Sequence, residues 1–336
     1  MNQSSPSRSV TGSERQPAID WLKALAVVAV ITTHAGTAAF PGTPGYTWWD
    51  SVFRHLLTDF HVPCLLMISG FLYHRSQPVG LAEVGRRLER ILLPYLVASL
   101  VVFAVMPSQA PSSAKAMAVA LLGANALGIY YYVFLLVLFV AMLPLFSRLP
   151  LRILQATVGL LLLALAAMCV FPQLRLSLDF FWSMRNPVES FTLGYFLLGW
   201  IAAAERHRPL RWSSKTDLAI VLLAASAWPV CVELGSPYPT ILLAKIPYAV
   251  LVWKLAWRFL NSRPAPALIQ STSDATYGIF LYHFLAQEPL RYQIADWPPP
   301  LRIAILTAVG LSGGLLFGEA VRRVVGPRVA RRLFGY

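Results

Sequence analysis

The fold is decided by the stretch Ile19-Asp-Trp-Leu-Lys-Ala-Leu-Ala-Val-Val-Ala-Val-Ile-Thr-Thr-His34. Its length and apolar content predict a helix that crosses a membrane. Two ionisable side chains, Lys23 and His34, lie inside this predicted span, where such groups are costly and usually functional. Eleven residues are about three helical turns, so the two side chains share one face and lie roughly 16 Å apart. The spacing places a cation near one membrane surface and an imidazole beyond the midplane, which suggests a path across the bilayer.

The composition of the whole chain also indicates a membrane protein. Of its 336 residues, 57% are hydrophobic and only 13% are charged, and the mean hydropathy is +0.60. A soluble protein of this length carries about 25% charged residues. Because the apolar residues recur in blocks of about 20, we expect an all-α fold, a polytopic membrane helix bundle of about ten transmembrane helices.

The apolar blocks place the spans at 19–39, 52–73, 88–107, 128–147, 152–171, 188–204, 217–235, 241–260, 273–289 and 301–321. Residues 114–127 are apolar but contain Gly123 and Asn125, and we expect a surface or re-entrant helix there. Three parts follow from this layout: a disordered N-terminus at 1–18, one transmembrane domain at 19–325 and a basic tail at 326–336.

The net charge of +13 is explained by topology rather than by binding to nucleic acid. Nineteen of the 28 Lys and Arg residues fall in loops on the side of the N-terminus, and six fall on the other side. This bias follows the positive-inside rule and predicts that both termini are cytoplasmic. The three cysteines lie in separate apolar stretches without metal-ligand spacing, so we expect neither disulfides nor a metal site.

Two interpretations of the cytoplasmic end of the first span stay open. Asp20 and Lys23, spaced i, i+3, can form a simple interfacial ion pair with a snorkelling lysine. Alternatively, Lys23 is a cation that holds phosphate as a point charge. His34 is in turn either a packing residue or a functional group, and its place in a membrane span favours function.

The second and third spans carry further candidates. Ser69-Gly70 either allows close helix packing or lines a site, and His61 with Pro63 can shape an acceptor pocket near the outer end. The loop that contains Arg86, Arg87 and Arg90 either only fixes the topology or, with Arg75, forms an anion site beside Lys23. The ninth span contributes Tyr282 and His283 near the outer surface.

These segments together resemble the acyltransferase 3 family of integral membrane acyltransferases. The first span is similar to the family's opening signature, an acidic residue followed by a basic residue and then, after ten residues, a histidine. Three later segments also match in order: 60–72 (FHVPCLLMISGFL), 87–95 (RLERILLPY) and 277–283 (YGIFLYH). The resemblance runs from about residue 17 to 325, with Lys23 where the family more often has Arg.

The resemblance implies an enzyme of the bacterial cytoplasmic (inner) membrane that moves an acyl group, most often acetyl. The donor is cytoplasmic acetyl-CoA, and the acceptor is a hydroxyl of an extracytoplasmic glycan or glycolipid, of the exopolysaccharide or lipopolysaccharide type. Membrane lipids and polysaccharide-assembly proteins are further expected partners, and nucleic acid is not. The site residues that we expect are His34 as general base with Asp20, donor-binding Lys23, Ser69, Arg75, Arg86, Arg87 and Arg90, and acceptor-binding His61, Tyr282 and His283.

Three alternatives remain at this point. The reaction can pass through a transient acyl-His34 intermediate instead of direct transfer. The protein can be a transporter or flippase for a lipid-linked sugar or small solute, although its sequence has few mid-span carboxylates and no strong internal repeat of the kind typical of that class. It can also be a non-catalytic member of a polysaccharide-export assembly, in which case His34 is replaceable.

Overall fold

Helices form the regular secondary structure of residues 15–36, 57–170, 192–205 and 238–336, which are the residues that the computed structural model describes, and no strand occurs among them. In chain order the main helices are α1 (Pro17–Ala35), α3 (His61–Tyr73), α4 (Leu81–Val105), α5 (Ala114–Leu122), α6 (Tyr131–Ala141), α7 (Leu143–Phe146), α8 (Leu151–Val170), α10 (Leu193–Ala204), α12 (Tyr238–Leu260), α13 (Ala267–Asp274), α14 (Thr276–Arg291), α15 (Pro299–Val325) and α16 (Pro327–Val329). The all-helical class is therefore confirmed.

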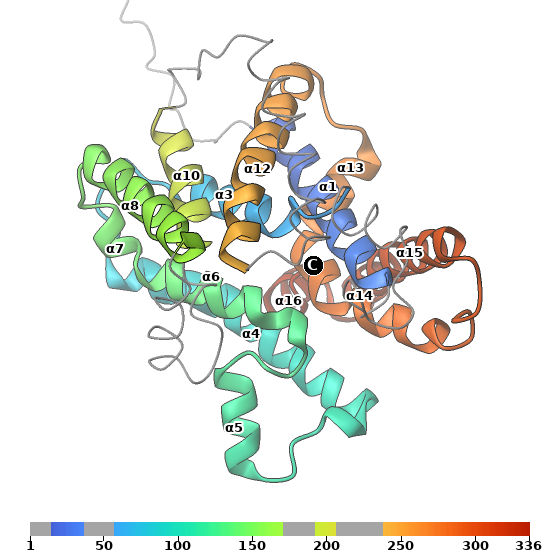
Figure 1. Cartoon of the computed structure of the whole chain (residues 1–336). Helices are drawn as coiled ribbons and strands as arrows, with labels where there is room; N and C mark the ends of the chain where they lie inside the picture. Colours follow the sequence, from blue (N-terminus) through green and yellow to red (C-terminus); the bar gives the residue numbers. More distant parts are fainter. Residues whose placement is uncertain (1–14, 37–56, 171–191, 206–237) are drawn as a thin grey trace, which may run out of the picture.

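Three of these helices, α1, α4 and α15, are long and apolar enough to cross a membrane. Each predicted span overlaps a described helix except 217–235, which lies outside the described residues. The total of ten spans and the cytoplasmic placement of both ends stay predictions. The helix predicted within 114–127 is α5, which has no buried residue and projects from the other helices (Figure 1).

The first helix lies at the centre of the bundle and packs against α3, α12, α13, α14 and α15 (Figure 1). It begins at Pro17, two residues before the predicted span, because proline suits the first helical position and Asp20 in the first turn favours the helix dipole. The hydroxyls of Thr32 and Thr33 bond to backbone carbonyls one turn earlier, so these polar side chains fit an apolar helix.

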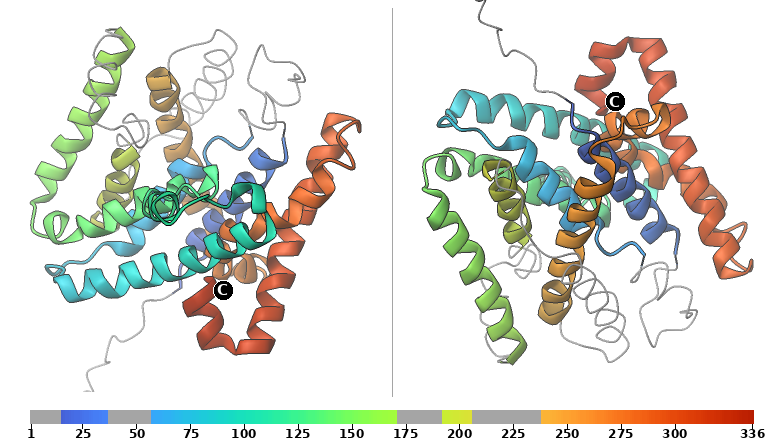
Figure 2. Two further views of the ribbon diagram at one scale, coloured as in Figure 1. Left: turned by 90° about the horizontal axis from the view of Figure 1, so that it is seen from below. Right: turned by 90° about the horizontal axis from the view of Figure 1, so that it is seen from above.

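One other boundary differs from the prediction. The predicted span 273–289 is broken at Ala275, where α13 ends and α14 begins. The predicted basic tail at 326–336 is folded, and its Tyr336 is buried against Gly278 of α14 and Gly318 of α15. Its arginines remain exposed, and Arg332 pairs with Glu89 of α4. Figure 2 shows α8 and α15 at opposite edges of the molecule, with α1 between them.

The contact between α3 and α10 depends on two glycines. A Cβ on Gly70 would lie 1.9 Å from the carbonyl oxygen of Phe196, and a Cβ on Gly199 would lie 1.8 Å from that of Met67. Both distances are far below van der Waals contact, so the two helices touch through their backbones. Small residues allow such close approach between helices in membranes.

We therefore expect Gly199→Ala to lower the free energy of unfolding by roughly 1–3 kcal/mol, since the added methyl group must push α3 and α10 apart. The measurement is thermal unfolding of the detergent-solubilised protein. Gly85→Ala on α4 is the control, because a Cβ there meets nothing within 4 Å. Equal melting temperatures for the two variants would contradict this account of the contact.

Candidate active site at the two ends of the central helix

A cavity of about 490 Å³ opens beside the first turns of α1. Its walls come from four segments that are far apart in the sequence: the start of α1, the end of α3 with the residues that follow, the end of α10, and the end of α13. The charge bias predicts all four on the cytoplasmic side. The lining residues include Arg15, Asp20, Lys23, His74, Arg75 and Asp274.

The two carboxylates of the cavity are both engaged by Arg15. Asp20 accepts hydrogen bonds from the Arg15 guanidinium at 2.6 and 3.1 Å and from the Ser273 hydroxyl at 2.7 Å. The same guanidinium reaches Asp274 at 3.2 Å. Hydrogen bonding to Asp20 raises the pKa of Arg15 above its ordinary value. The network ties the start of α1 to α13 and neutralises much of the negative charge.

Lys23 and Arg75 are the other two cations of the cavity. No carboxylate of the described residues lies within ion-pair distance of the Lys23 ammonium group or the Arg75 guanidinium. Arg75 donates to the backbone carbonyls of Leu72 and His74, at 3.2 and 2.8 Å. The described lining carries three cations, Arg15, Lys23 and Arg75, against two carboxylates, and this excess of positive charge favours an anion.

The opposite end of α1 brings two histidines together. The rings of His34 and His283, on α14, lie with their centroids 5.6 Å apart and their planes tilted by 31°. His34 is half-buried, and His283 is fully buried. Arg291, two turns after His283 on α14, donates to the backbone carbonyl of His34 and fixes the end of α1 against α14.

A family model for an acyltransferase domain matches residues 16–319, which is nearly the whole chain. The chain belongs to the acyltransferase 3 family. Comparison with curated proteins and with solved structures found no match. The family makes this protein a membrane acyltransferase in general terms, and its donor, acceptor and site residues are proposals.

The structure does not bring the predicted arginine cluster to the cavity lining. Arg86 and Arg87 both pair with Glu83 at 2.7 Å, and Arg90 is exposed on the same helix. The Arg87 guanidinium is buried, lies over the ring of Tyr73 and donates to the Tyr73 carbonyl at 3.1 Å. None of the three arginines is among the residues that line the cavity.

The remaining predicted residues are distributed over other contacts. Ser69 bonds to the carbonyl of Leu65 and to the Tyr132 hydroxyl, inside the bundle. His61 bonds through Nδ1 to the carbonyl of Thr58, whose hydroxyl lies 2.6 Å from that of Thr33, the residue before His34.

Tyr282 and Asp20 make contacts with residues other than the histidine pair. Tyr282 stacks on Tyr336 with the ring centroids 6.1 Å apart. Fourteen residues of α1 separate Asp20 from His34, which is about 21 Å along a helix. The two predicted catalytic residues therefore cannot act on the same atom.

Sequence reasoning missed several residues that the structure places at the two ends of α1. Arg15 and Ser273 belong to the network around Asp20, and Gln287 and Arg291 hold the other end of α1. Gln287 had a readable signal, because an uncharged polar side chain within an apolar span usually finds a partner on a neighbouring helix. Arg15 had none, since it lies in the stretch predicted to be disordered.

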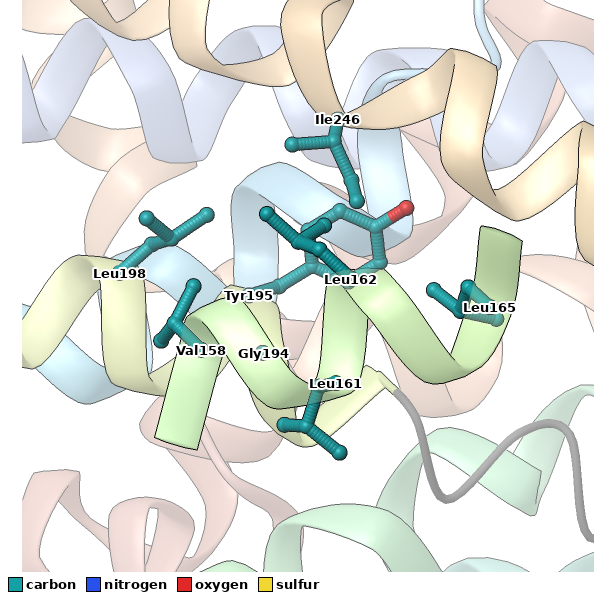
Figure 3. A pocket seen from close by; sticks show the side chains of 8 residues that line it. All are labelled: Val158, Leu161, Leu162, Leu165, Gly194, Tyr195, Leu198 and Ile246. Atoms are coloured by element: carbon teal, nitrogen blue, oxygen red, sulfur yellow. The ribbon is translucent and has the colours of Figure 1, made fainter. Parts of the chain in front are cut away.

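A second cavity lies between α8, α10 and α12 (Figure 3). Its walls are leucine and valine side chains with Tyr195 and Ile246, and its volume is about 10 Å³. That is room for about one water molecule. Apart from Tyr195, the described side chains that line this space are apolar, so it is a small gap in an apolar region. Within the described residues no group of three or more His, Cys, Asp or Glu is placed to hold a metal ion.

The Arg15–Asp20 pair yields a prediction about stability. We expect Arg15→Gln and Asp20→Asn each to lower the melting temperature by roughly 2–4 °C, because each removes the Arg15–Asp20 ion pair, whose strength is limited by the partial exposure of Arg15 to solvent. The double variant should lose clearly less than the sum of the two single losses, since both remove the same interaction. Additive losses in a thermal-unfolding cycle would show that the pair is not coupled.

Proposed function

We propose that the protein transfers an acetyl group from cytoplasmic acetyl-CoA to a hydroxyl of an extracytoplasmic glycan or glycolipid. The observation that carries the proposal is the difference between the two ends of α1. Lys23 and Arg75 line an open cavity at one end, and His34 lies beside His283 at the other. Acetyl-CoA is a polyanion with its acyl group at the end of a long flexible arm. A donor of this shape fits a phosphate site and a reaction centre roughly 16 Å apart.

Lys23 and Arg75 would hold the phosphates of the donor by charge-assisted hydrogen bonds. The arm would then follow the face of α1 toward His34. Ala26, Val27 and Val30 lie on this face between the two ends, and all three are buried, while the cavity ends at Lys23. Donor binding therefore has to displace the side chains that are packed on this face.

His34 would act as the general base. A neutral imidazole takes the proton of the acceptor hydroxyl while the oxygen attacks the thioester carbonyl, and a C–O bond replaces the C–S bond. The proton then passes to the departing CoA thiolate. The thioester supplies the driving force, and the role of the protein is to position the donor, the acceptor and His34.

The donor site gives the first test. We expect Lys23→Gln and Arg75→Ala each to raise the KM for acetyl-CoA roughly 10-fold, since each removes a hydrogen bond from a charged group. Lys23→Arg should keep most of the affinity. Arg148→Ala is the matched control: Arg148 is also exposed, is also predicted to be cytoplasmic, and also donates only to a backbone carbonyl, that of Pro144. If the control raises KM as much as the two test variants do, the cavity is not the donor site.

The reaction centre gives the second test. We expect His34→Ala to lower kcat roughly 100- to 10,000-fold while acetyl-CoA still binds, because the base is lost but the donor site is intact. The measurements are acetylation of the host's surface glycan at matched expression and acetyl-CoA affinity of the purified protein. Near-normal acetylation in both His34→Ala and Lys23→Gln would refute the proposal and would favour a transporter or a scaffold.

A further inference from the structure

Helix α14 presents two buried hydrogen-bond acceptors next to the end of α1. The Nε2 atom of His283 and the Oε1 atom of Gln287 are both buried, and neither has a hydrogen-bond partner among the described residues. The spacing i, i+4 places them on one face of α14. A buried polar atom without a partner destabilises the fold, so two of them at one place call for a functional explanation.

The protonation of His283 is fixed by the backbone of its own helix. Its Nδ1 atom lies 2.9 Å from the carbonyl oxygen of Phe280 and 3.1 Å from that of Ile279. Carbonyl oxygens only accept hydrogen bonds, so Nδ1 must carry the proton. Nε2 of the neutral ring then has a lone pair that can accept a hydrogen bond from a neighbouring donor.

The ring of His34 lies beside that of His283, with the two centroids 5.6 Å apart. The carboxamide nitrogen of Gln287 donates to the carbonyls of Ile31 on α1 and Leu306 on α15, both at 3.1 Å, which fixes the spacing of these helices around His34. Catalytic hydrogen bonds in structures without substrate are often long and tighten when the substrate binds. A hydrogen bond between the two rings therefore needs a rotation of the His34 side chain that brings one ring N–H to Nε2.

We propose that His283 is a positioning residue for His34, a role that rests on the proposed function above. Its Nε2 accepts a hydrogen bond from one ring N–H of His34, which directs the lone pair of the other ring nitrogen of His34 to the acceptor hydroxyl. When His34 takes the hydroxyl proton, this hydrogen bond becomes charge-assisted and stabilises the imidazolium. The proton stays on His34 until the CoA thiolate takes it, and His283 remains neutral throughout.

The test compares His283→Leu with His283→Gln in detergent-solubilised protein that has been given acetyl-CoA and a glycolipid extract of the host's membranes. We expect His283→Leu to lower kcat roughly 10- to 100-fold, as for residues that orient another functional group, with the KM for acetyl-CoA changed less than about 2-fold. The melting temperature should stay the same or rise, because leucine removes a buried polar atom without a partner. A residue needed only for packing would show the opposite pattern.

His283→Gln should recover kcat to within about 5-fold of the wild type, because its amide oxygen can accept from His34 while its NH₂ group donates to the same carbonyls. Leu281→Met, a change of a buried apolar residue on the same helix, is the control and should leave kcat within about 2-fold.

Two results would overturn the proposal: wild-type kcat in His283→Leu, or a loss of kcat that follows a lowered melting temperature and is not restored by glutamine. The outcome of His34→Ala distinguishes a failure of the role proposed for His283 from a failure of the proposed function. If His34→Ala is inactive and His283→Leu is fully active, only the role of His283 is wrong. If His34→Ala is fully active, the proposed function itself fails.

Discussion

The structure depends on one constraint: α1 packs against five helices, so the polar groups on its buried faces need hydrogen-bond partners within the protein. Lipid cannot satisfy such groups, and a polar group left alone is costly. Partners come from α13 for Asp20, from Arg15 just before the helix, from α15 for the Thr32 hydroxyl and from α14 for the His34 carbonyl. The arrangement of the surrounding helices is therefore fixed by the polar groups of α1 as well as by its apolar faces.

The polar groups at the two ends of α1 differ in kind. At its first turns the groups are charged and face an open cavity, where solvent and the paired arginine reduce the cost of charge. At its last turn the groups are backbone carbonyls, hydroxyls and the imidazole of His34, and Arg291 donates to the His34 carbonyl there. Such a division suits a reaction whose donor is a polyanion held at one surface and whose chemistry transfers a neutral acyl group at the other.

Much of this fold can be predicted from the sequence, because hydropathy and helical period report on each helix alone. The first span and the shared face of Lys23 and His34 follow from one uninterrupted apolar stretch, and α1 is indeed continuous from Pro17 to Ala35. The break at Ala275 could not be predicted, since no proline or glycine marks it. It nevertheless places Ser273 and Asp274 beside Arg15 and Asp20.

The arginines that follow the second span show a second limit to prediction from the sequence. Four arginines follow the second span within sixteen residues, and their density makes a single anion site the obvious interpretation. Sequence density does not tell which way a side chain points on a helix or which helix ends meet. Arg87 turns back onto Tyr73 and Glu83, whereas Arg75 points into the cavity.

The pair of histidines illustrates why stability and function have to be considered together. A bundle optimised only for stability would put apolar side chains at 283 and 287, because the buried acceptor atoms of both residues lack donors in the described structure. Gln287 recovers part of this cost by linking α1 to α15 through its amide group. Among the described residues, the hydrogen bonds of His283 go to carbonyls of its own helix, so they add no hydrogen-bonded link between helices. Unlike an apolar side chain, the His283 imidazole places a fixed lone pair beside His34. Such a lone pair can serve a reaction, whereas it adds nothing to the stability of the fold.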